Sequence, residues 1–410
     1  MVSTIFYSIV LFIMLLIVVK KRASLGIVLI GQYFLISLFS VILLKENYMH
    51  FQQINLAPYL LLLVSYIITF FPFLDLKNEF KVTKLNVKYY RIYNYFVYLY
   101  IFFAVVVITM DLPSFLETIM SGEWSEQRNL YYDEKIVLYD NLLERIALNY
   151  LVYFRLICLI IYFLFLKNDY KPRTRSLLLI SIIIPLILTS IATASRGTIY
   201  QFFLLFFAFI LFFSKAISKK QLRKIKIFIV ILGSIFLIFA LSVTIDRFSS
   251  STSLDKSSLS SIIEYLGQSP LIFNERVFPI NSHTLGTYSF GNLLEWFGVN
   301  IQYPQSTIGG SWGAGFYTYV GIPYIDFGII GVIIHSILLN FVITYLMRKR
   351  KLKLRHFFMI FYVYEYLLKG SFVIGRSQII SVVINLIIYF CLYAIDKIKV
   401  NNKNKNYIEL

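Results

Sequence analysis

Charged side chains are scarce in this sequence, and acidic ones are the scarcest. Only 15% of the 410 residues are charged, with 21 Asp or Glu against 39 Lys or Arg, whereas 59% are hydrophobic. A soluble domain of this length needs a much more polar surface than that composition can provide. The shortage of charge therefore excludes an ordinary soluble globular protein and favours a chain whose solvent is largely lipid.

Cysteine and histidine are also rare. The two cysteines, Cys158 and Cys391, both fall inside apolar runs, and only four histidines are present. No CxxC or HExxH spacing, no His/Cys cluster and no Walker loop occurs, and no DxD-like pair precedes a soluble nucleotide-sugar fold. The sequence thus predicts no disulfide framework, no metal and no cofactor. Any chemistry must use a substrate that is already activated in the membrane.

What the chain does have is a series of long apolar runs. Most are close to the ~20 residues that a helix needs to cross the hydrocarbon core. They predict an all-α polytopic membrane protein with about eleven transmembrane helices, at 2–19, 25–44, 57–75, 92–110, 147–166, 176–194, 198–214, 227–245, 323–347, 357–373 and 378–395. The tenth is the weakest, because Glu365 and Lys369 interrupt it.

The distribution of Lys and Arg predicts the orientation of these helices. Alternate connecting segments, beginning with the one after the first run, hold 28 of the 39 basic residues. By the positive-inside rule these segments are cytoplasmic, which places the N-terminus outside and the C-terminus inside. The first run is followed, not preceded, by basic residues, the reverse of a cleavable signal peptide. The net charge of +18 then reflects insertion topology, and nucleic acid is not an expected partner.

Two predicted outer segments are too long to be simple connectors in what we expect to be one integral membrane domain, 1–410. The first, 111–146, is acidic, with eight Asp or Glu against three Lys or Arg. The second, 246–322, is the largest and contains Trp312 within a Gly-rich stretch, Gly309–Gly315. Long loops on a rigid scaffold usually carry function. We therefore expect the activity to lie on the outer face of the membrane.

Several arginines stand on that outer face, against the general charge bias. They are Arg196 in the turn Ser195-Arg196-Gly197, Arg247 after the eighth run, Arg276 in the large loop, and Arg376 between the last two runs. A shared anionic ligand would explain them, and guanidinium groups suit phosphate. Ser195 can cap the following helix, whose N-terminus also favours an anion. The alternatives are snorkelling to lipid headgroups, and local pairing of Arg247 with Asp246 and of Arg276 with Glu275.

Arg155 is different, because it lies in the middle of the fifth run. An arginine at that depth must face the bundle interior or an aqueous cavity. It serves either a ligand or an internal ion pair, for instance with Glu365.

His283, the only histidine in the large loop, is a candidate general base, since imidazole titrates near neutral pH. A solvated or structural histidine is the alternative. The other candidate bases are carboxylates, which the sequence does not rank: Glu264, Glu275, Glu295 and Asp326.

The end of the large loop carries the best local motifs. They are Ser306-Thr307-Ile308-Gly309-Gly310-Ser311, then Phe316-Tyr317-Thr318, then Asp326-Phe327-Gly328-Ile329-Ile330-Gly331. With the Ser195-Arg196-Gly197 turn and the many-helix layout, this pattern resembles Wzy-type oligosaccharide repeat-unit polymerases of the O-antigen ligase/polymerase superfamily. The loops lack an arginine followed by ten residues and then a glycine, a pattern of some members, so the resemblance does not single out the essential arginines.

The resemblance implies a GT-C-like fold and a metal-independent, inverting glycosyl transfer on the outer face of the cytoplasmic (inner) membrane. The donor would be a growing glycan on undecaprenyl pyrophosphate and the acceptor a single repeat unit on the same lipid, for capsule, O-antigen or exopolysaccharide. His283, Arg196 and Arg247 are the expected catalytic residues, and Arg155, Arg276, Arg376 and Trp312 the expected substrate-binding ones. Membrane lipids and the flippase and chain-length regulator of the same pathway are the expected partners.

Three other functions stay open at this point. An O-antigen ligase would move the glycan to a different acceptor. A flippase or other transporter for the same lipid-linked unit would need charged residues along a central pathway, and the intramembrane charges here are few. A non-catalytic membrane scaffold is the third.

Overall fold

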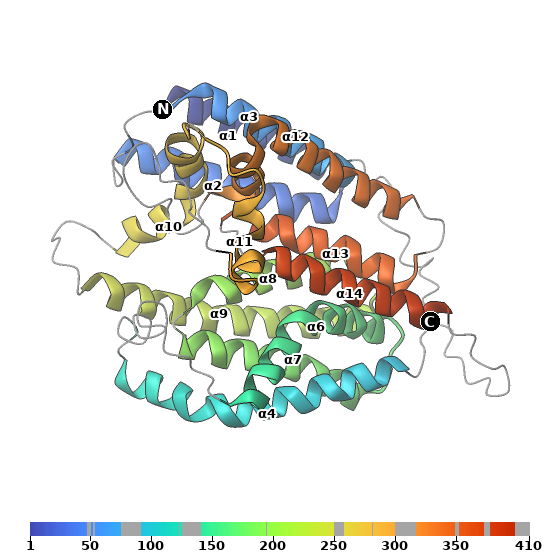
Figure 1. Ribbon diagram of the computed structural model, residues 1–410. Coiled ribbons are helices and arrows are strands. Elements are labelled where there is room, and N and C mark those ends of the chain that lie inside the picture. Colours follow the sequence, from blue (N-terminus) through green and yellow to red (C-terminus); the bar gives the residue numbers. More distant parts are fainter. Residues whose placement is uncertain are drawn as a thin grey trace. The chain divides into compact units, whose positions relative to one another are not determined.

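The computed structural model of the protein is all-helical throughout its described residues (Figure 1). Those residues are 1–46, 51, 54–74, 92–122, 124, 141–193, 195–249, 258–280, 282–299, 317–348, 352–372 and 378–397. Eight helices within these ranges are long and apolar enough to cross a membrane. The prediction of a polytopic helical membrane protein is thereby confirmed in its class.

The helices of the chain group into two compact units. Unit 1 comprises Met1–Lys81 and Leu259–Ile395, and unit 2 comprises Val82–Ser258 and Asp396–Leu410. Unit 1 holds α1 (Val2–Lys21), α2 (Ser24–Glu46), α3 (Leu56–Leu74), α10 (Ser258–Ile272), η2 (Phe273–Val277), α11 (Thr287–Trp296), α12 (Thr318–Met347), α13 (Leu354–Lys369) and α14 (Gln378–Lys397). Unit 2 holds α4 (Ile92–Ser121), α6 (Leu142–Lys167), α7 (Pro172–Ala192), α8 (Arg196–Phe213) and α9 (Lys219–Ser249).

Each of the eleven predicted spans falls largely within one of these helices. Three of the helices that contain a predicted span are not among the eight long apolar helices, namely α8, α13 and α14. The apolar parts of α8 and α14 are shorter, Gly197–Phe213 and Ile379–Ile395, and α13 has 16 residues. In α13 the two charges that weakened the prediction form an i,i+4 ion pair, with 2.8 Å between Lys369 Nζ and Glu365 Oε1. Pairing reduces the cost of holding both charges in a mostly buried helix.

The two long segments predicted to lie outside the membrane contain more helix than the apolar pattern suggested. α4 continues past the predicted end of its span and stops only at Ser121. The segment 246–322 includes the last turn of α9, all of α10, η2 and α11, and the first residues of α12. Many residues that could carry function therefore lie on helices, whose backbone fixes their positions better than a loop would.

The interior of unit 1 is built from tyrosines with hydroxylated neighbours. Tyr33 and Tyr66 meet edge to face with ring centroids 4.8 Å apart, and Tyr66 packs against Tyr319 at 5.7 Å. Ser65 on α3 hydrogen-bonds to the Tyr319 hydroxyl (3.0 Å) and to Ser336 Oγ (2.7 Å), both on α12. All five side chains are buried. In lipid, burial of apolar surface does not favour one arrangement of helices over another, because the lipid tails are equally apolar. Hydrogen bonds between helices therefore help to specify which faces pack together.

Unit 2 has an antiparallel pair, α4 and α6, joined by aromatic contacts. Phe96 stacks on Phe154 with centroids 6.0 Å apart, and Phe103 meets Tyr150 at 5.0 Å. α6 starts at an Asn141 N-cap, whose side-chain oxygen accepts from the Leu143 N–H at 2.9 Å. The beginning of α6 is thus fixed beside the later turns of α4.

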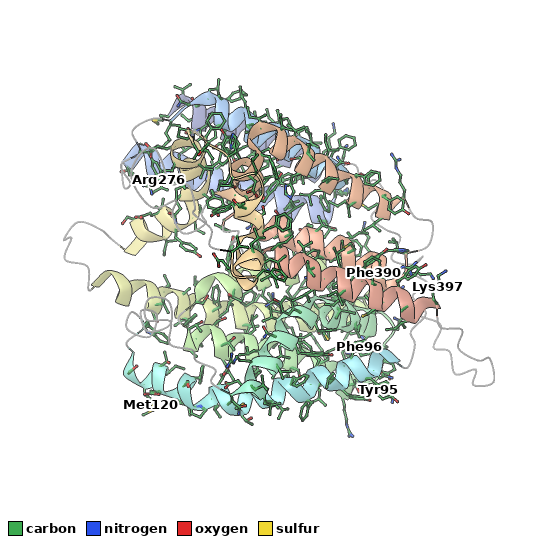
Figure 2. All side chains as sticks on the ribbon, in the orientation of Figure 1. Tyr95, Phe96, Met120, Arg276, Phe390 and Lys397 are labelled. Carbon is green, nitrogen blue, oxygen red and sulfur yellow. The ribbon has the colours of Figure 1, made fainter. Side chains whose placement is uncertain are left out.

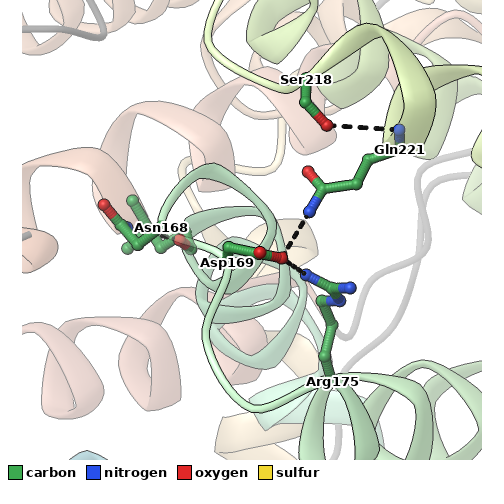
Figure 3. A network of polar contacts seen from close by, with 6 residues as sticks. Asn168, Asp169, Arg175, Ser218 and Gln221 are labelled. Atoms are coloured by element: carbon green, nitrogen blue, oxygen red, sulfur yellow. Dashed lines mark hydrogen bonds and ion pairs between the residues drawn. The ribbon is translucent and has the colours of Figure 1, made fainter.

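At the other end of unit 2, a polar clasp joins the α6–α7 turn to the start of α9 (Figure 3). Asp169 Oδ1 accepts from Arg175 Nη1 at 3.1 Å and from Gln221 Nε2 at 2.7 Å.

Away from such polar contacts the surface is strongly apolar. Met120 and Phe390, for example, carry exposed side chains (Figure 2). Apolar exposure on this scale suits lipid as the surrounding solvent.

Candidate functional site

α8 begins directly after a short turn that follows α7. The turn is closed by backbone hydrogen bonds, from Thr193 N–H to the Thr189 carbonyl (3.0 Å) and from Ser195 N–H to the Ser190 carbonyl (2.8 Å). Arg196 is therefore the first residue of a helix. The N–H groups of a first helical turn have no partner within their own helix, and they favour an anion bound at that helix end.

The details of this turn differ from the prediction. Ser195 occupies the N-cap position, but its side chain makes no capping hydrogen bond, so the prediction that it caps α8 is wrong. Its Oγ lies 3.5 Å from Thr198 Oγ1 instead. Gly197 is the second residue of α8 and not part of the turn. The first turn of α8 thus carries no side-chain cap from its N-cap residue.

Four helices meet beside this turn in an apolar cluster, which we call the helix-end cluster. Ile191 of α7, Ile199 of α8 and Phe239 and Val243 of α9 form its buried part. Partly buried side chains packed against it are Phe115, Trp124, Ile187, Phe203 and Phe236. Phe115 lies on α4, and Trp124 lies just beyond α4 and meets Phe239 edge to face at 5.4 Å. The cluster fixes one end of unit 2.

Two of the predicted arginines stand next to this cluster. Arg196 lies three residues before Ile199, and Arg247 lies four residues after Val243 on the last turns of α9. With a rise of ~1.5 Å per residue, each arginine backbone is about one helical turn from a cluster residue. Unit 2 thus brings Arg196 and Arg247 to the same end of one packed group of helices.

A carboxyl pair that the sequence patterns did not single out lies at the same end. Asp111 on α4, four residues before Phe115, and Glu144, in the first turn of α6, are both buried. Glu144 is both a hydrogen-bonding and an electrostatic neighbour of Asp111. One feature of the sequence could have identified these two residues. Each lies close to the end of an apolar run, within the segment 111–146 that was predicted to be an acidic loop.

Arg155 lies in the middle of α6, as predicted, and its side chain is half-buried. The buried Tyr100 on α4 is an electrostatic neighbour of Arg155. The suggested partner of Arg155, Glu365, belongs to unit 1 and forms the ion pair with Lys369 described above.

Unit 1 contains the second group of predicted residues, around a break in α12. Gly328 has φ 63° and ψ −149°, a conformation that only glycine adopts readily, inside the helix that runs from Thr318 to Met347. The break leaves carbonyl groups without helical partners. The Ile325 and Asp326 carbonyls accept instead from the N–H groups of Thr284 (3.1 Å) and Leu285 (2.9 Å).

The Asp326 side chain completes this arrangement. It is fully buried and accepts hydrogen bonds from the N–H groups of Gly286, Tyr288 and Ser289, each at 3.1 Å. The hydroxyls of Thr284 and Ser289 also donate to it. Both carboxylate oxygens are therefore occupied in fixing the start of α11 on α12. Asp326, one of the candidate bases, has a structural role here.

His283 and Arg276 lie close to the same break. The exposed His283 ring meets Tyr324 edge to face at 5.6 Å, and its Nε2 would be 2.7 Å from a Cβ built on Gly328. Arg276 is half-buried in the π-helix η2 (Figure 2). η2 contacts α12 and is linked to it by the hydrogen bond from the Tyr324 hydroxyl to the Phe278 carbonyl at 2.7 Å. π-helical turns are frequent at functional sites.

The remaining predicted residues are placed as follows. Arg376 and Trp312 lie outside the described residues. Among the other candidate bases, Glu275 is buried in η2, Glu264 is half-buried in α10, and Glu295 is exposed in α11.

No protein-family model, curated protein or solved structure matches this chain. Function must therefore be inferred from the geometry and chemistry of the residues themselves. The features available for that inference are the two arginine positions beside the helix-end cluster, the buried carboxyl pair, and the broken helix with His283 and Arg276.

Proposed function

We propose that this protein polymerises lipid-linked oligosaccharide repeat units at the outer face of the cytoplasmic membrane. The donor is a growing glycan on undecaprenyl pyrophosphate, the acceptor is one repeat unit on the same lipid, and the transfer is inverting and metal-independent. One observation carries the proposal. In a multi-pass helical protein, Arg196 and Arg247 stand about one turn from the same apolar cluster, at one end of unit 2.

The chemistry explains why arginines at that place matter. Breaking the bond between the sugar and the pyrophosphate leaves additional negative charge on the departing phosphate. Fixed guanidinium groups stabilise that charge most effectively where water is partly excluded, because they need no reorganisation at the moment of reaction. The uncapped first turn of α8 adds N–H groups and the positive end of a helix dipole beside Arg196. Arg196 and Arg247 are the residues that we assign to the pyrophosphate.

The remaining assignments rest on the sequence resemblance. Arg155, Arg276, Arg376 and Trp312 bind the substrate, and His283 is the predicted base for the acceptor hydroxyl. Polymerisation also needs a flippase to supply the lipid-linked units and a regulator of chain length, and these are the expected partners. A ligase that transfers the glycan to a different acceptor would use the same donor chemistry.

A flippase or transporter is the second candidate, and the broken helix α12 is the observation that favours it. Discontinuous membrane helices are typical of secondary transporters, where the free ends of half-helices face the substrate. Here the freed carbonyls of Ile325 and Asp326 are taken by Thr284 and Leu285, and the Asp326 carboxylate is fully hydrogen-bonded. Because the protein's own groups satisfy these ends, we favour the polymerase.

Reconstitution separates the two candidates. Purified protein in liposomes, supplied with polyprenyl-pyrophosphate-linked repeat units and no energy source, should produce a ladder of glycans that differ by one repeat. Movement of the lipid-linked unit between leaflets without any ladder would instead establish transport and refute the polymerase.

The site is tested in the same assay by Arg196→Ala and Arg247→Ala. Each change should lower ladder formation by about 10²–10³-fold, the usual cost of losing one charge-stabilising donor. Arg145→Ala is the matched control, since Arg145 is an exposed arginine at the start of α6, at the same end of unit 2. Normal chain length in both site variants would rule out the assigned site.

A further inference from the structure

The carboxyl pair of unit 2 is a buried titratable group with no part in the proposed reaction so far. Asp111 and Glu144 are 4% and 8% exposed, and they are close enough to hydrogen-bond and to repel one another. Two ionised carboxylates in contact and away from water repel strongly, so such pairs share a proton. Such a pair is expected to titrate as one unit and to carry one shared proton.

One oxygen of this pair is left open. Asp111 Oδ2 is buried and has no hydrogen-bonding partner among the described residues. A buried acceptor without a partner is costly, and native structures rarely retain one without a reason. A second proton delivered to this oxygen would make the pair neutral, which a buried environment favours. The open oxygen is thus a proton acceptor that is already in place.

The pair is attached to the same packed helices as the two arginines. Asp111 precedes Phe115 by four residues, so it lies about 6 Å along α4 from a residue that packs on the helix-end cluster. Arg196 and Arg247 stand at similar distances along α8 and α9 from Ile199 and Val243. Asp111, Arg196 and Arg247 thus each lie about one helical turn, along their own helices, from a residue of the helix-end cluster.

Two other buried carboxylates of the described chain, Asp326 and Glu365, are engaged with partners. Asp326 accepts five hydrogen bonds, and Glu365 pairs with Lys369. Asp111 differs from both because its open oxygen can take a proton without breaking an existing contact.

We propose that the Asp111–Glu144 pair, in place of His283, is the general base of the glycosyl transfer, a role that rests on the proposed function. The acceptor hydroxyl oxygen forms a bond to the anomeric carbon of the donor. The bond from that carbon to the phosphate oxygen breaks, and its electron pair leaves with the pyrophosphate beside Arg196 and Arg247. The hydroxyl proton passes to the open oxygen of Asp111 and is released to water when the product leaves.

The test compares variants of the full-length protein in the liposome assay. Asp111→Asn should lower the rate of ladder formation by about 100-fold or more, the usual effect of removing a general base. Saturable binding of polyprenyl pyrophosphate should stay within about threefold of the wild-type value, because the arginines are intact. Glu144→Gln should lower the rate by about tenfold, and Asp111→Glu should restore part of it. Glu117→Gln is the matched control, an exposed carboxylate on the same helix, and should change nothing.

The outcomes separate the two proposals. A wild-type protein that makes no ladder overturns the proposed function and this inference with it. A wild-type ladder with an unchanged rate in Asp111→Asn overturns only the inference and leaves the pair a structural contact. If Asp111→Asn fails to fold, infrared spectroscopy of the wild type and Glu144→Gln decides. The shared proton requires a protonated-carboxyl band at neutral pH whose frequency changes in Glu144→Gln, and wild-type protein without that band contradicts the inference.

Discussion

Two buried carboxylates, one in each unit, show how differently the same group is used. Asp326 in unit 1 has five donors on its two oxygens and fixes the start of α11 on a broken helix. Asp111 in unit 2 contacts a second carboxyl and leaves one oxygen open. Burial alone therefore does not identify a reactive carboxylate. The difference lies in whether the surrounding groups have already used its acceptor capacity.

The largest difference is expected when both residues receive the same change, Asp to Asn. In Asp326→Asn an amide NH₂ faces at least one of the N–H donors, and we expect a loss of about 3 kcal/mol in the free energy of unfolding. In Asp111→Asn the amide can still bond to Glu144, so the loss should stay below about 1 kcal/mol. Unfolding midpoints in detergent measure both, and equal losses would remove the contrast between the two sites.

A glycine in each unit extends the comparison to the backbone. Gly328→Ala requires a positive φ of 63° and places a Cβ 2.7 Å from His283 Nε2. We expect a loss of about 2 kcal/mol in unfolding free energy. Gly233→Ala on α9 of unit 2 is the control, since it has open space around it and should be neutral or stabilising by up to about 1 kcal/mol. Adding His283→Ala to Gly328→Ala should recover only the steric part. A harmless Gly328→Ala would mean that α12 is continuous.

A smaller effect is expected from the interior hydroxyls. Ser65→Ala removes the hydrogen bonds to Tyr319 and Ser336 and should cost about 0.6–1 kcal/mol, as interhelical hydrogen bonds in membranes do. Ser234→Ala on α9 removes an exposed hydroxyl that bonds only to the Val230 carbonyl of its own helix. The thermal unfolding midpoint should fall in Ser65→Ala and stay unchanged in Ser234→Ala. A midpoint that falls only in Ser234→Ala would show that the tyrosine interior does not depend on its hydrogen bonds.

The smallest effect separates the two candidate bases. If the Asp111–Glu144 pair takes the proton, His283→Gln should change the rate of glycan extension by no more than about threefold, against the ~100-fold loss for a removed general base. If His283→Gln lowers the rate of glycan extension as much as Asp111→Asn does, His283 of unit 1 is the general base.

The membrane helices could be located from the sequence because lipid imposes a simple rule, namely a long apolar run for each crossing. Every predicted span coincides with a helix for that reason. The break at Gly328 could not be located in the same way. The residues around it, Phe327, Ile329 and Ile330, continue the apolar pattern, and the break depends on the amides of Thr284 and Leu285, some 40 residues away.

The candidate site was predicted only in part. Arg196 and Arg247 were recognised because basic residues are unexpected on the outer side. Both arginines lie beside the same cluster because Ile199 of α8 and Val243 of α9 belong to it. These two residues are far apart in the sequence, so the sequence pattern did not reveal that they pack together. Asp111 was assigned to a loop because the apolar run ends before it, whereas α4 continues to Ser121.

The most direct test of the arginine site is the binding of polyprenyl pyrophosphate, without any sugar, to the purified protein. We predict saturable binding by the wild type, a loss of at least about 100-fold in affinity when Arg196 and Arg247 are both replaced by Ala, and no loss in Arg145→Ala. Unchanged affinity in the double variant would contradict the claim that the helix ends of unit 2 hold the lipid pyrophosphate.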